Sequence, residues 1–86
     1  MEFLFKDESE ADLAYWYQTD KKTIKKIEAL FKSMKASPFS GIGKPEALKY
    51  DLSGKWSRRI NGKDRIIYSV ENGTITIYSL RGHYSK

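Results

Sequence analysis

Hydrophobic positions near the start of the chain change from a continuous run to a helical spacing. Glu2–Lys6 is a short run rich in apolar and aromatic residues, which predicts a strand. Asp7 ends this run and Glu10 follows three residues later, so Asp7 has the position of an N-cap in a capping box, with aspartate in place of serine or threonine. The helix that begins here is expected to bury one apolar stripe, formed by Leu13, Trp16 and Tyr17.

A second helix is predicted from the break at Thr19-Asp20 to about Lys35. Its apolar residues recur at helical spacing, and they are Ile24, Ile27, Leu30, Phe31 and Met34. Lysines occupy the opposite side of the same helix, at Lys21, Lys22, Lys25, Lys32 and Lys35. The two helices therefore form a hairpin with one apolar side.

The pattern becomes strand-like in the second half of the chain. Residues 37–47 contain two prolines and two glycines without periodicity, so they form a loop for which Phe39 is the expected anchor. Turn signals then separate four strand-like runs, Leu48–Leu52, Trp56–Ile60, Arg65–Val70 and Thr74–Leu80. The sequence predicts an α+β fold in the order β-α-α-β-β-β-β, an antiparallel sheet with the two-helix hairpin on one face.

The turn at Asn72-Gly73 predicts which side chains share a face of this sheet. It pairs Val70 with Ile75, Tyr68 with Ile77 and Ile66 with Ser79, which gathers the apolar members on the face that the helices cover. The open face then carries Arg65, Ser69, Thr76, Tyr78 and Leu80. A three-residue loop at Asn61-Gly62-Lys63 would place Arg59 opposite Arg65, and a two-residue loop would place Arg58 there.

Composition restricts the chemistry that the chain can carry. Its 86 residues have the size of one domain, spanning residues 1–86. With no cysteine and one histidine, we expect no disulfide, no metal site and no other cofactor. The N-terminus is acidic and its apolar run is too short for a signal peptide or a membrane span, so we expect a cytoplasmic protein.

Charge is distributed unevenly around a net value of +5. Residues 1–20 hold one lysine and six acids, whereas residues 21–86 hold 15 basic side chains and five acids. All four arginines lie in the last third of the chain, and the planar guanidinium group suits phosphate oxygens. A polyanion is the expected partner of the basic part, with a merely solvated lysine surface as the alternative.

The only histidine, His83, is the side chain best suited to exchange a proton near neutral pH. Glu46 and Lys49 precede the strands that carry the arginines, and Tyr84 follows His83. A carboxylate base, an imidazole acid, cations for a phosphate and an aromatic ring are the parts of a metal-free RNA-cleaving site, because RNA supplies its own 2′-hydroxyl nucleophile. Taken singly, each residue also has an ordinary structural explanation.

Together the motifs resemble a known family. They are Lys44-Pro45-Glu46-Ala47-Leu48-Lys49, Leu52-Ser53-Gly54-Lys55-Trp56-Ser57-Arg58-Arg59-Ile60, Asp64-Arg65-Ile66-Ile67-Tyr68 and the closing His83-Tyr84. They closely resemble the YoeB/Txe branch of the RelE/ParE toxin superfamily, over essentially the whole chain. The resemblance implies the toxin of a type II toxin–antitoxin system, a ribosome-dependent and metal-independent mRNA endonuclease that cuts in the ribosomal A site and inhibits translation.

The resemblance also implies roles for individual residues. Glu46 corresponds to the general base that takes the proton of the 2′-hydroxyl, and His83 to the general acid that protonates the departing 5′-oxygen. Arg65 corresponds to the cation that stabilises the pentacovalent phosphate, and Tyr84 would orient or stack on the substrate. The further phosphate-binding groups would be Lys49 and Arg59.

The implied partners are the ribosome with its small-subunit rRNA, mRNA and a YefM/Axe-like antitoxin, with no membrane. The sequence leaves open whether the free toxin is a monomer or a homodimer. Two other functions use the same scaffold. A non-catalytic ParE-like inhibitor of DNA gyrase would share the fold, and a basic RNA-binding module would share the charge. Neither of them needs the set Glu46, Arg65, His83 and Tyr84.

Overall fold

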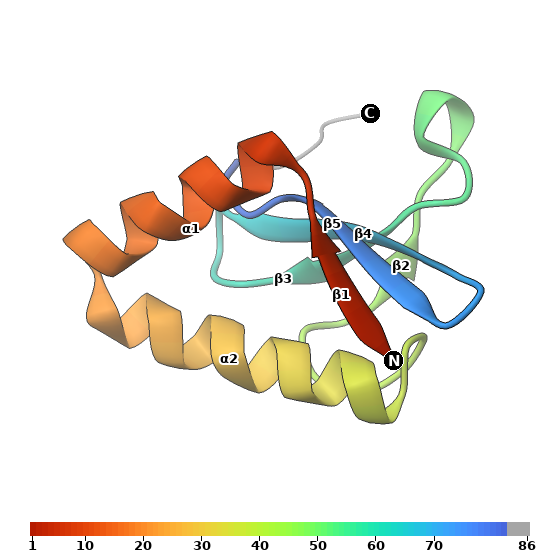
Figure 1. Ribbon diagram of the computed structural model, residues 1–86, viewed down its shortest axis with the longest axis horizontal. Coiled ribbons are helices and arrows are strands. Elements are labelled where there is room, and N and C mark those ends of the chain that lie inside the picture. The colour runs from red at the N-terminus through yellow and green to blue at the C-terminus, as the bar shows by residue number, and fades with distance from the viewer. Residues whose placement is uncertain (83–86) are drawn as a thin grey trace.

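The computed structural model describes residues 1–82 of the chain. Its elements are β1 (Glu2–Phe5), α1 (Asp7–Thr19), α2 (Lys21–Ala36), β2 (Glu46–Ala47), the 3₁₀ turn η1 (Tyr50–Leu52), β3 (Trp56–Arg59), β4 (Arg65–Glu71) and β5 (Thr74–Ser79). Both helices pack on one face of a five-stranded sheet, which confirms the α+β prediction (Figure 1). None of the helices within residues 1–82 has the length and apolar character needed to cross a membrane.

The sheet has the strand order β1-β5-β4-β3-β2. Strands β2 to β5 form a four-stranded antiparallel meander as predicted, except that its first strand is β2 within the predicted loop and not Leu48–Leu52. Strand β1 pairs with the outer edge of β5 in parallel. A parallel pair needs a long connection, and the chain between these two strands includes both helices and the other three strands. The sheet is therefore mixed rather than wholly antiparallel.

The core lies between the helices and the covered face of the sheet. Helix α2 supplies the buried side chains Ile24, Ile27, Leu30 and Met34, and the sheet supplies Ile66, Tyr68, Ile75 and Ile77. The Phe31 ring extends this core toward β1, with its centroid 5.2 Å from that of Phe3 and 5.6 Å from that of Phe5. The predicted apolar stripe of the second helix and the predicted apolar face of the sheet are confirmed.

Helix α1 differs from its prediction at both its cap and its buried face. Its N-cap is Lys6, and Asp7 lies inside the first turn, where an acid still favours the helix dipole. Tyr17 is 53% exposed, so its place in the buried stripe was wrong. The buried stripe runs instead through Ser9, Asp12, Leu13 and Trp16, which have helical spacing but include two polar residues.

The predicted strand Leu48–Leu52 is also wrong. Strand β2 ends at Ala47, and Tyr50–Leu52 form η1. Tyr50 has φ +58°, a left-handed conformation that cannot continue a strand. The segment instead closes as a turn, in which the Ser53 N–H donates to the Tyr50 carbonyl over 3.0 Å.

A β-bulge between β4 and β5 changes the predicted register. The predicted pairing is confirmed as far as Tyr68, but Ser79 then pairs with Ile67 instead of Ile66. The extra residue on β5 turns Leu80 toward the helices, where it is fully buried. The prediction that Leu80 lies on the open face is therefore wrong.

Residues 37–45 form the predicted loop, but Phe39 is not its main anchor. Phe39 is 52% exposed and only its ring packs against Trp56, with centroids 4.8 Å apart. The loop is held by the buried guanidinium of Arg58, which donates to the carbonyls of Ser37, Ser40 and Ile42 over 2.7 to 3.1 Å. Arg58 thereby ties the loop to β3.

Candidate functional site

A pocket of about 290 Å³ opens on the sheet face opposite the helices. It is lined by Glu46, Ala47, Leu48, Lys49, Leu52, Ser57, Arg65 and Ile67. Its volume lies just below the usual range for ligand pockets, roughly 300–1,000 Å³. Three residues with predicted roles, Glu46, Lys49 and Arg65, therefore surround one cavity.

Strand register decides which side chains face this pocket. Glu46 pairs with Ser57, and Ser57 pairs with Ile67, so these residues form one row across β2, β3 and β4. Arg59 pairs with Arg65 in the row two residues further along β3. Side chains two residues apart on a strand point to the same face, so both rows share the open face.

The loop between β3 and β4 settles the choice that the sequence left open between Arg58 and Arg59. The side-chain oxygen of Asn61 accepts from the N–H groups of Lys63 and Asp64, over 2.8 and 2.7 Å. This closes a three-residue loop, so Arg59 is the residue opposite Arg65. Arg58 points to the other face.

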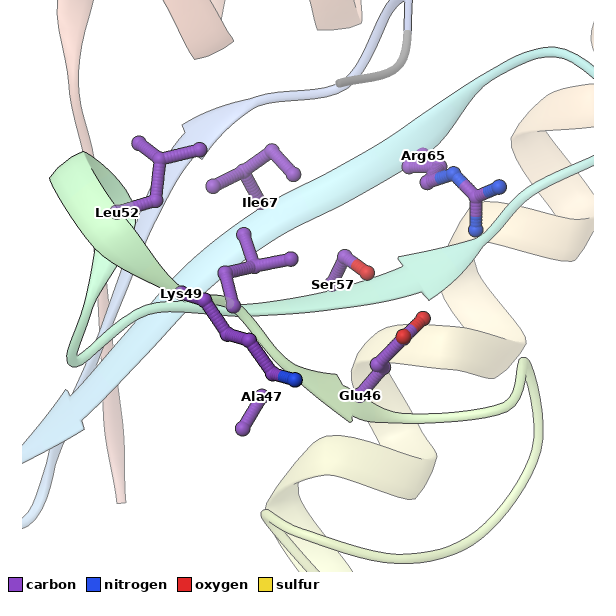
Figure 2. Close-up of a pocket in the computed structure, with 8 residues that line it drawn as sticks. Glu46, Ala47, Lys49, Leu52, Ser57, Arg65 and Ile67 are labelled. Atoms are coloured by element: carbon purple, nitrogen blue, oxygen red, sulfur yellow. The ribbon is translucent and has the colours of Figure 1, made fainter. Parts of the chain in front are cut away.

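The pocket has a polar end and an apolar end (Figure 2). The Glu46 carboxylate, the Ser57 hydroxyl and the Arg65 guanidinium face the same space at one end. Leu52 and Ile67 lie at the other end, away from Arg65. A ligand with one anionic part and one less polar part matches this division.

Positive charge gathers around the polar end. Arg59 is exposed and lies directly opposite the half-buried Arg65, and like charges in that position repel each other. Lys49 adds a third cation at the pocket wall. A bound phosphate would relieve this repulsion, because it accepts hydrogen bonds from guanidinium and ammonium groups. Within residues 1–82, no three His, Cys, Asp or Glu side chains gather closely enough to hold a metal ion.

The position of Glu46 follows from the way the preceding loop packs. The Arg59 N–H donates to the Gly43 carbonyl over 2.7 Å, which fastens the loop to β3 just before Glu46. Gly43 has φ +86°, and a Cβ there would lie 2.6 Å from a methyl group of Leu30. Only glycine therefore allows the loop to approach α2 so closely.

The outcome for the predicted site residues is uneven. Glu46, Lys49 and Arg65 line the pocket, and Arg59 adjoins it without lining it. His83 and Tyr84 lie outside the described residues. Sequence reasoning missed Ser57, whose buried hydroxyl sits between Glu46 and Arg65, although the alternation of Ser57 with Arg59 along β3 could have indicated it.

Comparison with known proteins points to one family. Residues 5–84 match the family described as the YoeB-like toxin of bacterial type II toxin–antitoxin systems. Toxin YoeB of Escherichia coli (strain K12) is 45% identical over 84 residues, which cover 98% of this chain and 100% of that protein. Two solved structures from Staphylococcus aureus are 42% identical and cover 98% of both chains: a heterotetrameric YoeB–YefM toxin–antitoxin complex, with a TM-score of 0.90, and a YoeB dimer, with a TM-score of 0.91.

Proposed function

Since this chain belongs to the family of YoeB-like toxins of bacterial type II toxin–antitoxin systems, we propose that it is an endonuclease that cleaves mRNA in the ribosomal A site. The observation that carries the proposal is the pocket in which Glu46, Lys49 and Arg65 meet. A carboxylate opposite cations can supply a general base and stabilise the charge that develops when a 2′-hydroxyl attacks a phosphodiester.

In the proposed reaction, Glu46 takes the proton of the 2′-hydroxyl, and the resulting 2′-oxygen attacks the adjacent phosphorus. The bond from phosphorus to the 5′-oxygen breaks, and His83 gives a proton to that oxygen. One fragment then ends in a 2′,3′-cyclic phosphate and the other in a free 5′-hydroxyl. Acid and base are both side chains, so the proposed reaction needs no metal ion.

The cations have separate tasks in this scheme. Arg65 stabilises the negative charge that develops on the pentacovalent phosphate, because its guanidinium faces the same space as the Glu46 carboxylate (Figure 2). Lys49 and Arg59 bind the flanking phosphates. Tyr84 stacks on or orients a base of the mRNA. All of these residues belong to one proposed domain, residues 1–86.

Helix α2 supports the ribosomal part of the proposal. Its lysines are exposed on the side away from the core, at Lys21, Lys22, Lys25, Lys26, Lys32 and Lys35. Such a row suits the phosphates of small-subunit rRNA, whose contacts supply affinity without reading sequence. We therefore place the action of this protein on translating ribosomes in the cytoplasm, where it would inhibit translation.

A partner follows from the family. The Staphylococcus aureus relatives form a complex with YefM and a YoeB dimer, so we propose a YefM-like antitoxin for this chain and a homodimer in its absence. An acidic segment that folds on binding could cover the cationic pocket face. The basic face would then be unavailable to RNA.

The proposal is tested by the ends of the RNA fragments. Translating ribosomes are incubated with the protein, with and without a metal chelator, and the cut is mapped by primer extension. The proposal requires a cut at the A-site codon, a cyclic or 3′-phosphate, a free 5′-hydroxyl and no effect of the chelator. Ribosome arrest without a cut would favour an RNA-binding inhibitor, and inhibition of DNA gyrase alone would favour the ParE-like alternative.

A further inference from the structure

The last described residues are held by contacts at both ends of a short segment, residues 80–82. Leu80 is held by α1: its N–H donates to the Asp12 carboxylate over 2.8 Å, and its carbonyl accepts from the Trp16 indole N–H over 2.9 Å. Gly82 is held at the start of β4: its N–H donates to the Asp64 carboxylate over 2.7 Å, and its carbonyl accepts from the Arg65 N–H over 2.9 Å.

The residue between them is held through its side chain. The guanidinium carbon of Arg81 lies 3.6 Å from the centroid of the Tyr15 ring, a close cation–π contact. Three consecutive residues are thus fixed by α1 and by the loop before β4. We call this set of contacts the tail clamp.

Two features indicate that the tail clamp does more than end a strand. It uses two carboxylates that are almost buried, with Asp12 only 8% and Asp64 only 6% exposed. Removing a carboxylate from water is costly. Both carboxylates accept hydrogen bonds from backbone N–H groups that lie beyond the last residue of β5. Leu80 is part of the core, but Arg81 and Gly82 lie beyond both the last strand and the core cluster.

The second feature is where the clamp ends. The Arg65 N–H donates to the Gly82 carbonyl, and the peptide bond to residue 83 starts at that carbonyl carbon. The clamp therefore fixes the point from which His83 and Tyr84 continue, beside the residue whose guanidinium faces the pocket. Without it, the backbone of residues 80–82 would be free to sample many conformations.

We propose that Asp64, assisted by Asp12 and Trp16, is a positioning residue that sets the acid at His83 relative to Arg65 and Glu46; this rests on the proposed function. Asp64 does not touch the substrate in this scheme. It acts through the Gly82 backbone, and what it supplies is the hydrogen-bond acceptor rather than the charge. Misplacing a reacting group by about 1 Å can reduce a rate by roughly 10²-fold.

The test compares Asp64→Ala with Asp64→Asn on programmed ribosomes under single-turnover conditions. Asparagine keeps a side-chain oxygen for the Gly82 N–H, and alanine does not. We expect Asp64→Ala to lower the cleavage rate constant at saturating ribosome concentration by roughly 10- to 100-fold. The ribosome concentration that gives half the maximal rate should stay within about twofold of the parent value. We expect Asp64→Asn to keep most of the parent rate.

Two further variants and one exchange measurement make the result specific. Trp16→Phe removes the indole N–H that donates to the Leu80 carbonyl and keeps an aromatic ring. It should lower the cleavage rate constant several-fold without changing the ribosome concentration that gives half the maximal rate. Glu10→Ala, an exposed acid on α1, is the matched control and should cut at the parent rate. Amide hydrogen exchange at Gly82 in the free protein should be faster in Asp64→Ala than in Asp64→Asn.

The outcomes separate this inference from the function on which it rests. If Asp64→Ala is folded, exchanges its Gly82 amide faster and still cuts at the parent rate, the positioning role is wrong and the proposed nuclease stands. If the cleavage rate constant of Asp64→Asn falls as far as that of Asp64→Ala, the explanation by a lost hydrogen-bond acceptor is wrong. A parent protein that does not cut mRNA overturns both the nuclease and the positioning role.

Discussion

Arg58 and Arg59 are neighbours in the sequence and have opposite surroundings. Arg58 is fully buried on the helix side of β3, and its five N–H donors are all used. Their acceptors are the Tyr68 and Ser33 hydroxyls and three loop carbonyls. Burial raises the pKa of Tyr68, so its hydroxyl stays protonated and donates to the Pro38 carbonyl over 2.9 Å. Arg59 points to the open face.

This contrast predicts opposite effects of the same substitution. Arg58→Lys keeps the charge but offers three donors without the planar fork, so buried acceptors lose their partners and the free energy of unfolding should fall by about 3 kcal/mol or more. Arg59→Lys should change it by less than about 0.5 kcal/mol, because that side chain is exposed. Urea unfolding of both variants measures this. Equal stabilities would contradict the role given to Arg58.

At the scale of elements, the hairpin of α1 and α2 depends on Asp20. The Asp20 carboxylate accepts from the Thr23 N–H over 3.2 Å and from the Thr23 hydroxyl over 2.8 Å, which caps α2. These hydrogen bonds favour the charged form, and they lower the pKa of Asp20 below its ordinary value. The cap therefore links helix stability to pH.

The sign of this link follows from the direction of the shift. A carboxyl whose pKa is lower in the folded state contributes its stability above its unfolded pKa and loses it as the pH falls through the folded pKa. Asp20→Ala should therefore melt below the parent near neutral pH, and the difference should shrink in acid. Thermal unfolding across this pH range is the measurement. A difference that stays constant into strong acid would show that the charged cap is not its source.

Helix α2 could be predicted from the sequence because its signals are local. A cap residue and an apolar residue at every third or fourth position are enough to define it. The apolar members Leu13 and Trp16 of the α1 stripe could be predicted, but its polar member Asp12 could not, because it is buried through a hydrogen bond to Leu80, 68 positions away. The bulge that turns Leu80 inward and the left-handed Tyr50 likewise depend on tertiary contacts that no local pattern reports.

At the scale of the whole molecule, the site is assembled from distant segments. The loop held by Arg58 brings Glu46 to one edge of the sheet, and the hairpin closed by Asn61 brings Arg65 beside it. Residue patterns alone predicted the open face and its arginines, but they left Arg58 and Arg59 as alternatives because loop length was ambiguous. The roles of Glu46, His83 and Tyr84 came from the family resemblance, since isolated residues of these types are common on protein surfaces.

The central claim is that Glu46 and His83 act as base and acid. The most direct measurement is the single-turnover rate of A-site mRNA cleavage by Glu46→Gln and by His83→Gln, with ribosome binding and thermal unfolding measured on the same preparations. Glutamine keeps hydrogen-bonding capacity and removes the titrating group, so each variant should fold and bind ribosomes like the parent and cleave slower by roughly 10²-fold or more. Cleavage by both variants at the parent rate would contradict the account.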